Sequence, residues 1–268
     1  MKILFLGDVV GPSGCEGIKN LLPEIINKNK INFVVVNGEN AADEGVGITE
    51  KIANDFFNSG VNVITSGNHI WDNSETMNYI SNENRLLRPE NLISPSPGKG
   101  FEIYEISEGV KIGVLNLMGN VYMKKCENVW EVANKFLKKY SIKKDMDFLI
   151  VDFHGEITSE KMAMGHFFDG KATLVIGTHT HVPTSDSRIL NKGTAYQTDA
   201  GMCGDYDSVI GMNKENSLNK FFKKESKKHY PSIGKSSLSG VIIEGNIENG
   251  LSKSIKPFIY GGVLNNKN

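Results

Sequence analysis

The segment Leu174-Val175-Ile176-Gly177-Thr178-His179-Thr180-His181 joins a short apolar run to two histidines that stand two residues apart. The apolar run predicts a buried strand, which places both histidines just beyond the strand's carboxyl end. In an extended chain, residues i and i+2 point to the same side, so each imidazole would serve one of two neighbouring metal ions. A lone His-x-His is also common in solvated turns. Its meaning therefore depends on the side chains found at the ends of the other strands.

Four other apolar runs of the chain end in the same way, with a metal-binding type of side chain within a few residues. In open α/β sheets, ligand sites form in the crevice beyond the carboxyl ends of the strands. Five coincidences at this one position favour a shared metal site over five unrelated turns. The runs are 3–6, 33–36, 61–64 and 148–151, and the side chains that come after them are Asp8, Glu39 with Asn40, Asn68 with His69, and His154.

The types of these side chains indicate which ions would bind. Carboxylate, imidazole and amide oxygen suit Fe, Mn, Zn or Co, whereas a thiolate-rich zinc finger is not indicated. Eight candidate groups are too many for one tetrahedral ion and suit two. Two ions about 3.5–4 Å apart can stabilise both the attacking and the leaving oxygen of a phosphoryl displacement. With Asp8, Glu39 and a bridging hydroxide, two divalent ions leave a charge of about +1, which a phosphodiester monoanion neutralises.

Strand and helix patterns alternate through both halves of the chain, with hairpins attached, which predicts α/β layers with mixed sheets. Residues 199–211 are expected to form a Gly-rich loop, and Glu108-Gly109 the turn of a hairpin. No repeat or linker divides the 268 residues, so one domain over residues 1–268 is predicted. Helices are expected over 15–29, 49–59, 72–80, 129–140, 158–168 and the start of 214–235, and further strands over 101–106, 111–117, 187–190, 194–197, 239–244 and 252–259.

The composition argues against several classes of protein. A net charge of -1 gives no whole-chain basic field for nucleic acid. No run approaches the roughly 18 apolar residues of a membrane span. Three scattered cysteines and a short N-terminal apolar run, interrupted by Asp8, favour reduced thiols and the cytoplasm. No Gly-x-Gly-x-x-Gly follows the first strand, which disfavours a Rossmann oxidoreductase.

Several of these motifs together resemble one enzyme superfamily. Gly67-Asn68-His69 and Gly177-Thr178-His179-Thr180-His181, with Asp8 and His154, resemble the calcineurin-like metallophosphoesterases. Residues 37–40, 178–184, 201–202 and 208–212 look more narrowly like its YmdB-like bacterial branch, and the resemblance covers nearly the whole chain. It implies a four-layer α-β-β-α sandwich with two mixed β-sheets and a binuclear centre. It also implies 2′,3′-cyclic nucleotide phosphodiesterase activity.

The resemblance also implies a role for each matched residue. His69 would be the general acid. Two departures from the broad superfamily concern the first metal: Asp8-Val9-Val10 lacks the usual Asp-x-His histidine, and Glu39 replaces the usual bridging Asp. Both departures fit the YmdB-like branch. The first metal would be held by Asp8, Glu39 and His181 with Asn40 nearby, and the second by Glu39, Asn68, His154 and His179.

The remaining polar residues near the motifs are expected to support the site or to lie outside it. Asp152 and Glu156 flank His154 and are expected to be its hydrogen-bond partners. Asp199 is a candidate for a similar supporting position. His166 in a predicted helix and His229 in a Lys-rich loop are expected to lie outside the site.

We therefore expect a binuclear metal-dependent phosphodiesterase acting on cyclic nucleotides, with 2′,3′-cyclic favoured, or on other small phosphodiesters. A metal-bound hydroxide would attack phosphorus, and His69 would protonate the leaving oxygen. Iron is favoured, with manganese or zinc as alternatives. Two other functions stay open: a regulatory protein that binds nucleotides or RNA-processing partners, and a nuclease or phosphomonoesterase with the same metals. A homo-oligomer is compatible with all three, and no membrane association is expected.

Overall fold

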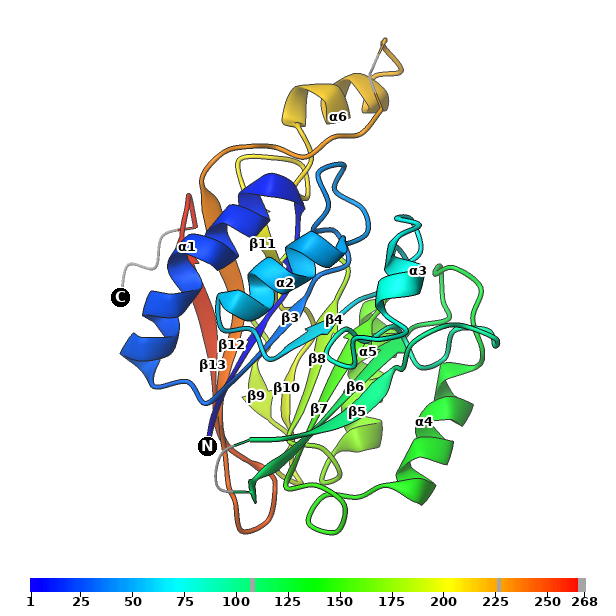
Figure 1. The fold of residues 1–268 in the computed structure, drawn as a ribbon, viewed down its shortest axis with the longest axis vertical. Helices are drawn as coiled ribbons and strands as arrows, with labels where there is room; N and C mark the ends of the chain where they lie inside the picture. Colours follow the sequence, from blue (N-terminus) through cyan, green and yellow to red (C-terminus); the bar gives the residue numbers. More distant parts are fainter. Residues whose placement is uncertain (107–108, 226–227, 265–268) are drawn as a thin grey trace.

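Two β-sheets face each other across the centre of the computed structural model, and helices cover their outer faces (Figure 1). The structure describes residues 1–106, 109–225 and 228–264. The order of the elements alternates between strands and helices in both halves of the chain, as the hydrophobic pattern predicts. Glu108, part of the predicted hairpin turn, lies outside the described residues.

The first sheet has the strand order β2-β11-β12-β1-β3-β4, and β13 pairs with β12. β1, β3 and β4 run parallel, whereas β12 is antiparallel to β1, β11 and β13. The sheet is therefore mixed. Its parallel strands β1, β3 and β4 are the ones that are followed by predicted ligand residues. Its strands are β1 (Lys2–Leu6), β2 (Asp8–Val9), β3 (Phe33–Asn37), β4 (Val63–Thr65), β11 (Met202–Asp205), β12 (Ser236–Gly245) and β13 (Ser252–Gly261).

The second sheet has the order β5-β6-β7-β8-β10-β9. Its four central strands are parallel, and β5 and β9 are antiparallel strands at the two edges. Both sheets are thus mixed, as predicted. The strands are β5 (Phe101–Glu105), β6 (Lys111–Met118), β7 (Phe148–His154), β8 (Leu174–Thr178), β9 (Arg188–Ile189) and β10 (Ala195–Gln197).

Three hydrophobic cores separate four layers, which confirms the predicted α-β-β-α arrangement. Alternate side chains of a strand point to opposite faces of its sheet, so β1 contributes to two of these cores. Leu4 and Leu6 pack with helices α1 and α2, whereas Ile3 and Phe5 pack with the second sheet. The third core lies between the second sheet and helices α4 and α5. The helices are α1 (Gly11–Asn29), α2 (Glu50–Asn58), α3 (Thr76–Tyr79), α4 (Val129–Lys139), α5 (Thr158–Phe168) and α6 (Lys214–Phe221).

Three predicted elements differ from the structure. The helix expected over 72–80 is reduced to α3. Neither of the two residues that could cap the longer helix does so, since the Asp72 carboxylate binds the His69 ring and Asn73 Oδ1 accepts the Glu75 N–H. The first helix begins at Gly11 rather than at Cys15. The segment 199–211, expected as a loop, contains β11, which pairs with β2 and β12. Among the described residues, no helix is long and apolar enough to cross a membrane.

Candidate metal centre

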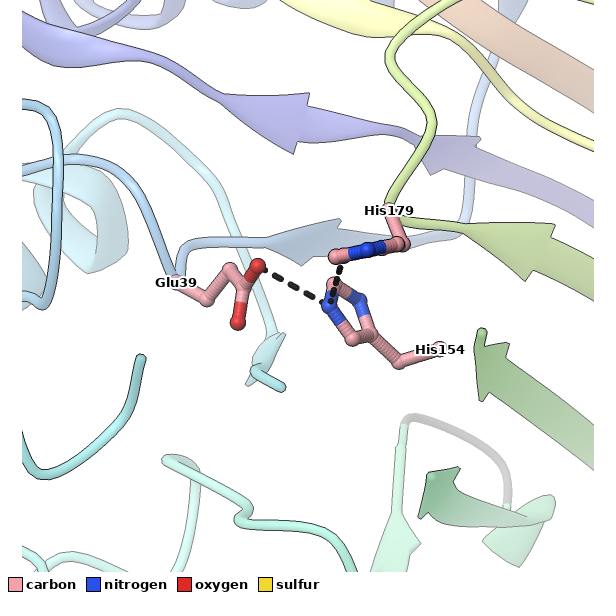
Figure 2. Close-up of side chains that lie close together, drawn as sticks. All are labelled: Glu39, His154 and His179. Carbon is pink, nitrogen blue, oxygen red and sulfur yellow. Dashed lines mark hydrogen bonds and ion pairs between the residues drawn. The ribbon is translucent and has the colours of Figure 1, made fainter. Parts of the chain in front are cut away.

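The predicted ligand residues converge where the central strands of the two sheets end. Glu39 follows β3, His154 is the last residue of β7, and His179 follows β8. Figure 2 shows these three side chains pointing toward one another from separate elements. One ligand-type atom from each of the three lies within 4.8 Å of the others, so they could hold a single metal ion.

The Nε2 atom of His154 is the centre of this cluster. It lies 2.9 Å from Glu39 Oε1, 3.1 Å from Asn68 Oδ1 and 3.0 Å from His179 Nδ1. His154 and Glu39 are fully buried. A single N–H on Nε2 can form a good hydrogen bond with only one of these three acceptors. The cluster therefore contains acceptor lone pairs that receive no hydrogen bond from it.

The other ring nitrogen of His154 is held by a hydrogen-bonded chain. The Thr178 hydroxyl donates to Asp152 Oδ1 at 2.7 Å and lies 3.0 Å from His154 Nδ1. Because the Thr178 hydroxyl donates its proton to Asp152, His154 Nδ1 must donate to the hydroxyl oxygen. This hydrogen bond orients the ring so that Nε2 points into the cluster. Asp152 was predicted to be a hydrogen-bond partner of His154. In the structure it is linked to His154 only indirectly, through the Thr178 hydroxyl.

Asp8, Asn40 and His181 form a second group beside the first. His181 Nδ1 donates to the carbonyl of Ile210 at 2.8 Å, which leaves a lone pair on Nε2. This Nε2 lies 3.9 Å from Asp8 Oδ1 and 3.1 Å from Asn40 Nδ2. Asp8 Oδ1 is buried and has no hydrogen-bond partner among the described residues. An orphaned carboxylate oxygen facing an imidazole lone pair is the arrangement that a cation stabilises.

Burial and nearby charges shift the pKa values of residues in both ligand groups. Burial raises the pKa of Asp8, and nearby histidines only partly oppose it. Burial alone would also raise the pKa of Glu39, but the adjacent His154 lowers it to about 2. The pKa of His154 is in turn raised to about 9, because Glu39 outweighs the effect of burial. Burial and the nearby His154 lower the pKa of His179 to about 3. His154 is thus the protonated imidazole of the metal-free cluster.

The backbone of the His-x-His segment is bent and does not continue the strand as expected. His179 and His181 have φ values of 97° and 65°, in the left-handed region that L residues rarely adopt. Asp8 Oδ2 accepts the backbone N–H of His179, and Asp199 Oδ2 accepts that of Thr180. Asp199 Oδ2 also accepts a hydrogen bond from the buried Lys161 ammonium group, at 2.6 Å. These anchors hold the strained turn, so both imidazoles face the centre although the chain is not extended.

A buried polar network beneath the cluster joins the two sheets. Asp152 accepts hydrogen bonds from Asn37 and Thr65 of the first sheet and from Thr178 of the second. Burial raises the pKa of Asp152 to about 6, although His154 and these three donors oppose the shift. The part of Asn37, Thr65 and Thr178 in this network was not predicted from the sequence. The available signal was that each is a polar residue at the end of a buried apolar run.

His69 lies at the open side of the centre. Its side chain is 30% exposed, and its Nδ1 lies 2.5 Å from Asp72 Oδ2. Its backbone N–H donates to Glu39 Oε2 at 3.1 Å, which fixes it beside the cluster. A cavity of about 340 Å³ opens here, and its lining includes both candidate ligands and the apolar residues Val46, Ile210 and Met212.

Two further expectations concern residues around the histidines. Glu156 was expected to contact His154, but its Oε2 lies 3.0 Å from His179 Nε2 instead. His154 is the last residue of β7, so a residue two positions later has already left the sheet. His166 and His229 are exposed and line no part of this cavity, as expected.

The two-sheet sandwich and the donor groups at its strand ends define the class of protein, a calcineurin-like metallophosphoesterase. Within that class the chain belongs to the YmdB-like family, whose profile, described as YmdB-like protein, matches residues 4–258. The crystal structure of a hypothetical protein from Thermus thermophilus matches with a TM-score of 0.90 at 34% identity, covering 98% of this chain and 100% of that one. A Mycoplasma pneumoniae phosphatase structure matches with a TM-score of 0.89 at 37% identity, covering 97% and 93%.

Two curated relatives carry named activities. A Bacillus subtilis protein named 2′,3′-cyclic-nucleotide 2′-phosphodiesterase is 41% identical over 256 residues, which is 96% of this chain and 95% of the relative. A Mycoplasma genitalium protein named putative phosphatase/phosphodiesterase is 38% identical over 251 residues, 91% of this chain and 87% of the relative. The predicted family is therefore confirmed.

Proposed function

We propose that the chain is a binuclear metal-dependent phosphodiesterase that hydrolyses 2′,3′-cyclic nucleotides. The phosphodiesterase class is confirmed by the family and by the names of the curated relatives. The cyclic nucleotide substrate is inferred from the Bacillus subtilis relative, which matches over nearly its whole length. The two metals and the part played by His69 are inferred from the geometry of the site.

The observation that carries the proposal is the surplus of buried lone pairs in two adjacent groups. His154 Nε2 faces three acceptors, and Asp8 Oδ1, which lies 3.9 Å from His181 Nε2, has no hydrogen-bond partner within the part of the chain that the structure describes. One cation in each group would satisfy both, and imidazole with carboxylate and amide oxygen suits iron, manganese or zinc. We assign Asp8, Glu39 and His181 with Asn40 nearby to the first ion, and Glu39, Asn68, His154 and His179 to the second.

The bound ions would supply Lewis acidity for the phosphoryl group and a water activated for attack. The chain's own contribution to proton transfer is His69. Its Nδ1 faces the Asp72 carboxylate, so Nε2 is the atom able to deliver a proton to the leaving oxygen. Lys124 Nζ lies 3.0 Å from the other oxygen of Asp72 and holds that carboxylate in place.

The His69→Ala variant should keep its metals but lose turnover. None of the contacts around His154 Nε2 or Asp8 Oδ1 involves the His69 ring, whereas loss of a general acid costs about 10²–10⁴ in rate. Metal content by mass spectrometry and kcat on a 2′,3′-cyclic nucleotide measure the two effects. His166→Ala, on an exposed helical position, is the matched control. Wild-type turnover by His69→Ala would remove His69 from the mechanism.

Uptake of the second metal should release a proton from His154. In the metal-free protein its pKa is raised to about 9, so the ring is protonated at pH 7, whereas a ligand nitrogen must be unprotonated. The apparent affinity should therefore rise about tenfold per pH unit up to that pKa and then level off. Calorimetric titration with Mn²⁺ in two buffers of different ionisation enthalpy counts the protons. A count of zero at pH 7 would contradict ligation by His154 Nε2.

The proposed function is tested by a metal-reconstituted assay over several phosphate esters. The panel contains 2′,3′- and 3′,5′-cyclic nucleotides, a bis-aryl phosphodiester, RNA and an aryl phosphate monoester. We expect the highest kcat/KM on the 2′,3′-cyclic nucleotides. Preferential cleavage of RNA or of the monoester would support the nuclease or phosphatase alternative instead. Tight nucleotide binding without turnover would support a regulatory role.

The cellular setting is proposed from the cysteines. Cys15, Cys126 and Cys203 are all free thiols, as expected for a protein kept in a reducing compartment. We accordingly propose a cytoplasmic enzyme with one domain over residues 1–268. Self-association and RNA-processing partners stay predictions.

A further inference from the structure

Val209 to Met212 form a tight turn at the rim of the candidate metal centre. Val209 and Met212 exchange both backbone N–H···O bonds, each at 2.9 Å. The two residues between them, Ile210 and Gly211, have φ values of 49° and 92°. Two positive φ values are typical of a type I′ turn, whose first central position normally holds Asn, Asp or Gly. The chain instead has a β-branched residue there, where an L side chain is strained.

Neither the turn nor the metal centre needs an isoleucine at this position. The turn supplies the centre with a backbone atom, the Ile210 carbonyl that accepts His181 Nδ1 at 2.8 Å. Asparagine or glycine would supply the same carbonyl with less strain. The side chain does not fill the core either, because it is 53% exposed. A residue that is unfavourable for its local backbone conformation, and that adds no contact needed by the fold, is expected at a functional site.

Ile210 is one of three apolar residues that line the cavity beside the candidate metal centre. Glu39, His69 and the His-x-His segment also line this cavity of about 340 Å³. The three apolar residues, which come from two separate loops and are here called its apolar wall, are Val46, Ile210 and Met212. A cavity lined both by cation-binding groups and by apolar residues suits a ligand that joins a phosphate to a flat, weakly polar ring.

We propose that Ile210, together with Val46 and Met212, contacts the base of the nucleotide substrate and sets the preference for nucleotides over diesters without a base. This inference rests on the proposed phosphodiesterase function. Every base presents a flat π-face, so an apolar contact of this kind accepts different bases. The wall therefore selects for the presence of a base rather than for its identity.

The kinetic test compares a 2′,3′-cyclic mononucleotide with ribose 2′,3′-cyclic phosphate, which lacks the base. In the wild type, the nucleotide should have the lower KM. Ile210→Gly and Ile210→Asn keep the turn and its carbonyl, so both should retain metal. In both variants the ratio of kcat/KM for the two substrates should fall about fivefold to tenfold, through KM. Ile247→Gly, at a similarly exposed isoleucine of the hairpin between β12 and β13, is the matched control.

A binding measurement separates this inference from the proposed function. Calorimetry of metal-loaded protein should show tighter binding of a nucleoside 3′-monophosphate than of ribose 3-phosphate, and Ile210→Gly should lose that difference. If the wild type hydrolyses neither cyclic phosphate, the proposed function fails, and the calorimetry still decides the role of the wall. Unchanged discrimination in Ile210→Gly, or loss of metal from it, would overturn the inference.

Discussion

Glu39→Gln should lose bound metal and reduce turnover by about 10³-fold or more, because Glu39 is the carboxylate proposed to bridge the two ions. The substitution preserves shape but removes the charge from a fully buried group. Glu39 Oε1 accepts from Asn40 Nδ2 and Oε2 from the His69 N–H. A glutamine therefore places its NH₂ against a second donor in either orientation, which adds a cost to the lost charge.

The same substitution has a readout that does not depend on metal. Glu39 is the main reason that the pKa of His154 is raised, so that pKa should fall in metal-free Glu39→Gln when followed by NMR of the imidazole. Glu156→Gln is the matched control, because Glu156 also contacts an imidazole of the cluster, His179, but is 50% exposed. Glu156→Gln should retain its metals. If Glu39→Gln retained both ions as well, the bridging assignment would be wrong.

The location of the candidate site could be predicted from the sequence because its donor residues follow apolar runs at short, regular distances. In a parallel arrangement of strands this spacing places them at one edge of the sheets, whatever the details of the loops. The structure brings Asp8, Glu39, Asn68, His154 and His179 together for this reason. The prediction needed only the type and order of the elements, which hydrophobic periodicity determines.

The conformation of the loops at the site could not be predicted, because it depends on contacts between residues far apart in the chain. The His-x-His turn is held by Asp8, 171 positions away, and by Asp199. Asp72, at the start of the helix predicted over 72–80, could cap that helix, but the nearby His69 ring takes its carboxylate. The local sequence is compatible with both partners, and only the tertiary arrangement decides between them.

β11 was missed for a related reason. Met202–Asp205 contains a glycine and lacks the apolar alternation of a strand, so the sequence indicates a loop. Its pairing with β2 and β12 comes from neighbours at both sides rather than from its own propensity.

Gly67→Ala should disable the centre while leaving the fold intact. An added Cβ would lie 2.3 Å from His154 Nε2, the central atom of the cluster, and 2.4 Å from Glu39 Oε2, which accepts the His69 N–H. Both side chains are buried and hydrogen-bonded, so they have little freedom to retreat. The φ of Gly67 is not in the left-handed region, so alanine adds no backbone strain. The substitution therefore acts by displacing the side chains of two proposed ligands, His154 and Glu39.

A displacement of about 1 Å in a catalytic group can cost about 10²-fold in rate, and here two groups move together, so turnover should fall by at least that factor. Metal content should fall with it, whereas the thermal unfolding midpoint should drop by only a few degrees. Gly204→Ala is the matched control, since its Cβ would meet nothing closer than 3.4 Å and should change neither quantity. Full activity in Gly67→Ala would mean that His154 and Glu39 can separate without loss of function. The tight packing of these two side chains around a shared ion would then be an incorrect account of the site.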